Sequence, residues 1–118
     1  MKKFFTPVFL AAFLFISFNA SSIPKLNSYP TAIATIFLDF DGHYVQSSVW
    51  NSGLPFNCAA SGMTDPQITE AFYRVAEDYR PFNINITTDS TVFFFFFLNM
   101  RMRVIINTTY WVAGVGGV

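Results

Sequence analysis

Hydrophobic and polar positions along the chain predict several β-strands. Thr31–Phe40 (TAIATIFLDF) is rich in β-branched and aromatic residues and ends at an Asp-Gly turn pair, so we expect a strand there. Between Phe82 and Thr87, apolar residues alternate with Asn and Thr, which is the period of a half-buried strand. Met102–Thr108 (MRVIINT) is a further candidate. His43–Trp50 (HYVQSSVW) has weaker strand character and is predicted to pair back on the first strand as a hairpin.

One segment has the spacing of an amphipathic helix. Asp65 can cap its start, with Pro66 at the first helical position, where a missing N–H costs nothing. Pro81 is expected to end the helix near residue 79 or 80. Its apolar stripe, which we predict to pack on a sheet, consists of Ile68, Phe72, Val75 and Tyr79.

Two segments lack a clear period. Asn51–Thr64 (NSGLPFNCAASGMT) has loop chemistry throughout. Val92–Leu98 (VFFFFFL) contains five consecutive phenylalanines and has the profile of an aggregation-prone segment. Two interpretations of this run stay open: a buried strand or hinge, or a misread stretch of sequence.

The first 22 residues have the order of a secretory signal peptide. Two lysines precede an apolar run, Phe4–Phe18, and small polar residues follow it. The run has 15 residues, whereas a bilayer span needs about 20, so a signal anchor is the weaker alternative. We therefore expect export to a periplasmic or extracellular location, with residues 23–118 as the mature part and no stable membrane anchor after signal removal.

The remaining composition excludes some chemistry. Seven basic and seven acidic residues give a formal charge of zero, so nothing indicates a nucleic-acid partner. Cys58 is the only cysteine and cannot form an internal disulfide; we expect a loop residue rather than a nucleophile. His43 is the only histidine, and a catalytic zinc needs about three protein ligands. We therefore predict no metal site and no cofactor in this chain.

Asp39-x-Asp41-Gly42 is the sharpest chemical pattern, because residues two apart on a strand point to the same side. It resembles the DxDG opening of haloacid-dehalogenase-like phosphatases, which implies Asp39 as nucleophile and Asp41 as acid/base. His43 stands where that family usually has Thr or Ser, and no lysine follows Lys25. A calcium loop would need a glutamate at the twelfth position, where Trp50 stands. A third interpretation is a capped strand end with Asp41 in the turn.

A larger pattern resembles the amino-terminal part of bacterial secreted zinc metallopeptidases of the metzincin type. It consists of IFLDFDGHYV, AFYRVAEDYRPFNINITTD and RMRVIINTTYWVAGVGGV, which lie between Ile36 and Val118. The resemblance implies an α/β fold, a twisted mixed sheet with one main helix packed on it. It also implies that the zinc helix, HExxHxxGxxH, would follow Val118. No HExxH occurs in the chain.

The same resemblance sets the functional expectation. The chain would be a fragment of a catalytic domain, inactive alone, whose full-length relatives hydrolyse peptide or protein substrates with zinc. The glycine-rich stretch after residue 113 is expected to lead to another element. Gly116, Gly117 and Val118 match the start of the edge strand that lines the substrate cleft in the family. The phosphatase and a non-enzymatic secreted domain stay open as alternatives.

Overall fold

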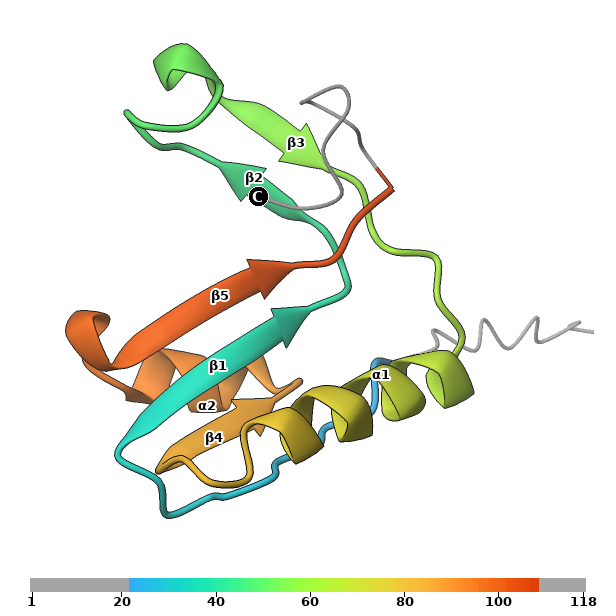
Figure 1. The fold of residues 1–118 in the computed structure, drawn as a ribbon. Coiled ribbons are helices and arrows are strands. Elements are labelled where there is room, and N and C mark those ends of the chain that lie inside the picture. The colour runs from blue at the N-terminus through green and yellow to red at the C-terminus, as the bar shows by residue number, and fades with distance from the viewer. Residues whose placement is uncertain (1–21, 109–118) are drawn as a thin grey trace, which may run out of the picture.

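The computed structural model describes residues 22–108. Figure 1 shows a small sheet with helices packed on it and a separate two-stranded sheet projecting beyond it. In chain order the elements are β1 (Ala34–Asp39), β2 (His43–Val45), η1 (Asn51–Gly53), β3 (Phe56–Cys58), α1 (Asp65–Asp78), β4 (Ile84–Thr87), α2 (Ser90–Phe95), η2 (Leu98–Met100) and β5 (Arg101–Ile105).

The main sheet has the strand order β4-β1-β5, and β1 pairs in parallel with both neighbours. Parallel strands need crossover connections, here provided by the segments that contain α1 and α2. The α/β class and the single main helix are thus confirmed. A mixed main sheet is not shown: its three strands are parallel, and antiparallel pairing among the described residues is limited to the separate sheet of β2 and β3 and to one isolated bridge between Asn27 and Thr87 at the outer edge of β4.

The hairpin forms with a different partner from the one predicted. β2 pairs with β3, whose residues Phe56–Cys58 lie inside the segment predicted as loop. The predicted return onto the first strand is wrong because β4 and β5 already occupy both edges of β1. A third neighbour has no edge of β1 left to pair with.

The helix α1 matches its prediction closely. Thr64, not Asp65, is its cap, and Gln67 Oε1 accepts a hydrogen bond from the Thr64 N–H at 2.9 Å. Pro66 is accordingly the second helical residue, which has no intrahelical N–H partner to lose either. The helix ends at Asp78, just before Pro81 as expected.

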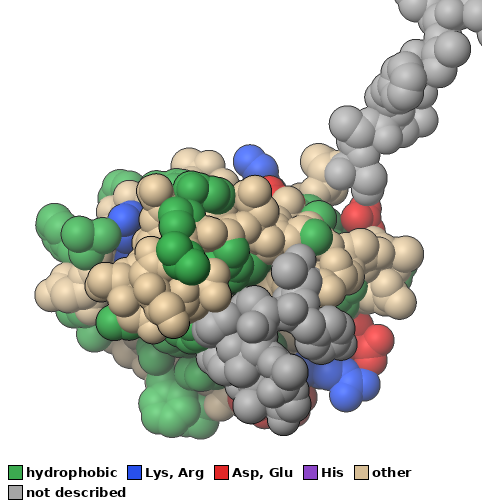
Figure 2. Space-filling model, turned by 90° about the horizontal axis from the view of Figure 1, so that it is seen from above, with side chains coloured by type: hydrophobic (Ala, Val, Ile, Leu, Met, Phe, Trp, Pro, Cys, Tyr) green, Lys and Arg blue, Asp and Glu red, His purple; other side chains and the backbone are tan. Residues whose placement is uncertain are grey.

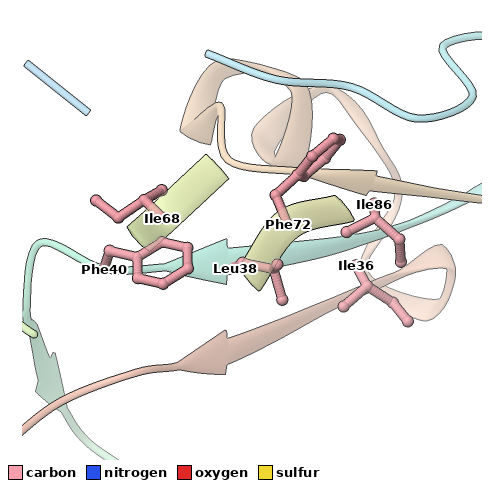
Figure 3. Packing of buried hydrophobic residues seen from close by; sticks show 6 residues of the cluster. All are labelled: Ile36, Leu38, Phe40, Ile68, Phe72 and Ile86. Carbon is pink, nitrogen blue, oxygen red and sulfur yellow. The ribbon is translucent and has the colours of Figure 1, made fainter. Parts of the chain in front are cut away.

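The hydrophobic core lies between α1 and one face of the main sheet. Of the predicted stripe, Ile68 and Phe72 are buried, and Val75 and Tyr79 pack partly buried at its border. Burying one such side chain contributes about 1.5–3 kcal/mol. Figure 3 shows the six buried members of this cluster, which are Ile36, Leu38, Phe40, Ile68, Phe72 and Ile86.

The phenylalanine run forms no strand: it lies in α2 up to Phe95, is extended at Phe96 and Phe97, and enters η2 at Leu98, so the interpretation as a buried strand is wrong. α2 begins after Asp89, whose carboxylate accepts the Thr91 N–H at 2.9 Å. Phe93 alone among the five phenylalanines is buried, with its ring centroid 5.5 Å from that of Phe37. Ile36 and Phe37 point to opposite faces of β1, so α2 covers the face opposite α1.

The two borders of the main sheet differ. The lead-in segment runs along β4: Ser28 N–H donates to Ile86 O at 3.0 Å and Thr88 N–H donates to Leu26 O at 3.1 Å. Both faces of β4 are buried as well, since Asn85, Ile86 and Thr87 are all buried, and the strand is not half-buried as its alternation predicted. Within residues 22–108, no strand pairs with the outer side of β5. No helix in this range is long and apolar enough to cross a membrane.

Candidate functional site

Four polar side chains meet where β1 ends and the chain turns toward β2. Asp39 is the last residue of β1, Asp41 lies in the turn, and His43 opens β2. Arg103 enters from β5, where it is paired in register with Phe37. Its guanidinium reaches along the sheet toward the carboxyl end of β1, so that Arg103 Nε lies 3.3 Å from Asp39 Oδ2.

Asp39 is a buried carboxyl group with a strongly perturbed titration. Only 2% of the residue is exposed, and its Oδ1 accepts the Asp41 N–H at 3.4 Å. Burial raises the pKa of Asp39 to about 7, with further upward contributions from the side-chain hydrogen bond and charge of Asp41. The positive charge of Arg103 acts in the opposite direction but does not outweigh burial. Near neutral pH this group is therefore present in both protonation states.

Arg103 bridges the two sheets and stacks against aromatic rings. Its guanidinium carbon lies 4.8 Å from the ring centroid of Phe93 and 5.5 Å from that of Phe37. Although Nε is close enough to Asp39 for charge attraction, its buried N–H forms no hydrogen bond to any described residue. The contact is thus an ion pair without hydrogen-bond alignment. This is consistent with the high pKa of Asp39, since an unaligned donor stabilises the carboxylate less.

The guanidinium of Arg103 also contacts the imidazole ring of His43. Arg103 Nη1 lies 2.8 Å from both ring nitrogens of His43, and a neutral imidazole offers one acceptor nitrogen to such a donor. Burial, and then the charge of Arg103, lower the pKa of His43. The neutral ring is therefore the form that suits this position, and it ties β2 to β5.

The turn between Asp39 and His43 depends on glycine. Gly42 has φ +91°, and a Cβ there would approach the Cys58 carbonyl oxygen to 2.9 Å. Cys58 is opposite His43 in the small sheet and is buried, so it is a strand residue rather than the predicted loop residue. Burial, and then the nearby charge of Asp39, raise the pKa of the Cys58 thiol, which keeps it in the weakly nucleophilic form.

This arrangement suits a structural role better than the predicted phosphatase chemistry. A nucleophilic carboxylate must be ionised and within reach of substrate, whereas Asp39 is buried, neutralised in part near pH 7 and covered by Arg103. Asp41 is more accessible and lines a hollow of about 300 Å³ with Lys25 and Asp89. Among residues 22–108, no group of three or more His, Cys, Asp or Glu side chains is placed to hold a metal ion.

The predicted site residues are only partly brought together. Asp39 and Asp41 are adjacent, as their spacing required, and the structure adds Arg103 to them. The RMRVI strand contains two arginines, which indicates that a cation there needs a partner, but the sequence does not indicate that Arg103 is the one that approaches Asp39. Gly116, Gly117 and Val118 lie outside the described residues.

Comparison of the chain with protein-family models, curated proteins and solved structures finds no match.

Proposed function

We propose that the chain is the amino-terminal part of the catalytic domain of an exported zinc-dependent peptidase of the metzincin type. Its substrates would be peptides or proteins, and its full-length form would require zinc. The proposal begins from the resemblance of the three sequence segments described above. In the haloacid-dehalogenase alternative, the same residues would need Asp39 as a free nucleophile, which its burial disfavours.

The observation that carries the proposal is the spatial arrangement of those three segments. LDFDGH covers the end of β1, the turn after it and the start of β2, VAEDYRPFNINITT forms the end of α1 together with β4, and RVI belongs to β5. They lie far apart in the sequence, yet they form one contiguous unit with the strand order β4-β1-β5 and α1 across one face. This supports a common sheet-and-helix scaffold of the kind that the resemblance implies.

In this proposal the cluster around Asp39 is part of the scaffold. Arg103 joins the end of β1, through Asp39, to the start of the hairpin, through His43. It thereby fixes β5 beside β1 in the register that pairs Leu38 with Val104. A sheet held in this way could position a neighbouring zinc helix, but the residues described here do not supply a zinc ligand set. The ligands and the general base would lie in sequence that follows Val118.

The coding sequence downstream of Val118 tests the proposal directly. We expect an HExxHxxGxxH motif within roughly one domain length. The extended protein should cleave a peptide substrate, lose activity with a chelator and regain it with zinc. Replacing the motif glutamate with glutamine should abolish cleavage while zinc binding remains, because that residue activates the water.

The 118-residue chain serves as the matched control. It should neither bind zinc stoichiometrically nor hydrolyse peptides, since it has one histidine. Tight zinc binding with proteolysis by this chain, or an extension without any zinc motif, would contradict the proposal. Hydrolysis of a phosphate ester that is lost in Asp39→Asn would instead support the phosphatase alternative.

A further inference from the structure

The connection from α2 to η2 exposes several large apolar side chains that are neighbours in the sequence, and we call this segment the phenylalanine tip (residues 94–98). Phe95, Phe97 and Leu98 are 88%, 84% and 80% exposed, and Phe94 is 63% exposed. Single exposed apolar residues are common, whereas adjacent large ones mark interaction surfaces. Figure 2 shows hydrophobic side chains that stand out from the surface of the molecule in several places.

The tip is attached firmly to the rest of the molecule at its base. Phe93 is buried against Phe37, and Asp89 caps the first turn of α2. On the other side, Arg101 Nη1 donates to the Phe93 carbonyl oxygen at 3.3 Å. The exposed rings are therefore carried on a fixed base, and folding of this region does not bury them.

A hollow lies beside the tip and extends its apolar character inward. It has a volume of about 610 Å³ and runs between residues 30–33 and α2. Most of its lining is apolar, with Ala32, Val92 and Phe96 among the lining residues. Its polar members include Asp89, whose carboxylate already accepts the Thr91 N–H. A hollow of this kind suits an acyl chain better than a polar ligand.

Charge distinguishes the possible partners of the tip. All seven acidic residues of the chain precede Ser90, whereas Arg101 and Arg103 follow it. Arg101 lies 4.5 Å from the ring centroid of Phe93 and 5.5 Å from that of Phe94, and it forms no ion pair within the described range. A second copy of the same tip would bring two Arg101 side chains together, and Asp89, the carboxylate that lines the adjacent hollow, already accepts the Thr91 N–H.

We propose that the phenylalanine tip is a docking surface for an anionic phospholipid bilayer. Aromatic and aliphatic side chains beside cations are the composition of segments that lie in a membrane interface. The exposed rings would enter the headgroup and upper acyl region, and Arg101 would stay at the anionic headgroups. This inference does not depend on the proposed peptidase activity.

The test places an added tryptophan on the tip of the full chain. Phe97→Trp is mixed with vesicles of phosphatidylcholine and phosphatidylglycerol that carry brominated acyl chains, which quench indoles that insert. The parent chain gives the background from its own two tryptophans. Tyr73→Trp is the matched control, because Tyr73 is 62% exposed on α1, away from the tip. The added indole of Phe97→Trp should be quenched, and that of Tyr73→Trp should not.

Two further variants distinguish the electrostatic attraction to anionic headgroups from the insertion of apolar side chains into the bilayer. Adding Arg101→Gln to Phe97→Trp should weaken docking to anionic vesicles about fivefold and leave vesicles of phosphatidylcholine alone unaffected. Adding Phe95→Ser should weaken docking to both, by roughly tenfold. Circular dichroism of each variant confirms that the fold is retained. Equal quenching of both tryptophans, no quenching of either, or a blue shift of the Phe97→Trp emission that depends on protein concentration without vesicles would overturn the proposal.

Discussion

At the scale of single residues, the burial of Asp39 is expected to make the stability of the molecule depend on pH, and the charge of Arg103 opposes this effect only in part. The carboxyl group binds its proton more tightly in the folded chain than in the unfolded chain, because burial raises its pKa from 3.8 to about 7. Its contribution to stability is therefore fully present below about pH 4 and is lost as the pH rises through about 7. A surface carboxylate that is stabilised by a cation has the opposite pH dependence, because its contribution to stability is lost as the pH falls.

We predict that Asp39→Asn removes this contribution. An asparagine keeps an acceptor for the Asp41 N–H and cannot ionise. Relative to the parent, the variant should gain stability as the pH rises from 4 to 7, by an amount on the order of a few kcal/mol. Urea unfolding at a series of pH values measures the difference. Parallel stability curves for the two chains would contradict the predicted pKa.

His43 provides a control with the opposite sign. Because its pKa is lowered below 6.5 in the folded chain, its contribution is present above that value and is lost as the pH falls through the folded-state pKa. In His43→Gln that opposing contribution disappears. The decline in the free energy of unfolding between pH 4 and 7 should consequently be steeper than in the parent chain, in the same urea titration.

At the scale of elements, the small sheet of β2 and β3 depends on the turn at Gly42. We predict that Gly42→Ala destabilises the chain by at least about 2 kcal/mol, because its φ of +91° is unfavourable for a side chain and the new Cβ meets backbone. Gly62→Ala is the matched control: its φ is +68°, but a Cβ there has nothing within 4 Å. Thermal unfolding of both variants measures the difference, and equal losses would show that the contact with Cys58 is unimportant.

The elements also show what local sequence can and cannot predict. The strand before Asp41 followed from its β-branched and aromatic residues and the turn pair after it, and the helix followed from the spacing of its apolar stripe; both are local properties. The partner of β2 did not, because it depends on β4 and β5 filling both edges of β1, which are distant in sequence. VFFFFFL had no period, and its helix is set by the Asp89 cap and the packing of Phe93. The two carboxylates of the site were predictable for the same local reason, whereas the approach of Arg103 was not.

At the scale of the whole molecule, stability depends strongly on the hydrophobic core between α1 and the main sheet. We predict that Phe72→Ala lowers the free energy of unfolding by about 3–5 kcal/mol, since its side chain is buried in the cluster of Ile68, Leu38 and Ile86. The neighbouring Tyr73 is exposed on the same helix, so Tyr73→Ala should cost well under 1 kcal/mol. Denaturant unfolding compares the two. Similar losses would mean that α1 does not pack on the sheet as described.

The strap that Leu26–Ser28 forms along β4 has a consequence for processing of the chain. A protease that removed the chain up to and including Ser28 would remove the backbone hydrogen-bond partners of Ile86 O and of the Thr88 N–H, and the outer edge of β4 would then be exposed. In the part of the chain described here, the main sheet of such a shortened product would have unpaired backbone at both of its edge strands, β4 and β5. Molecules of that kind can join flank to flank into extended polymers. The residues Leu26–Ser28 thus protect the main sheet from association through the outer edge of β4.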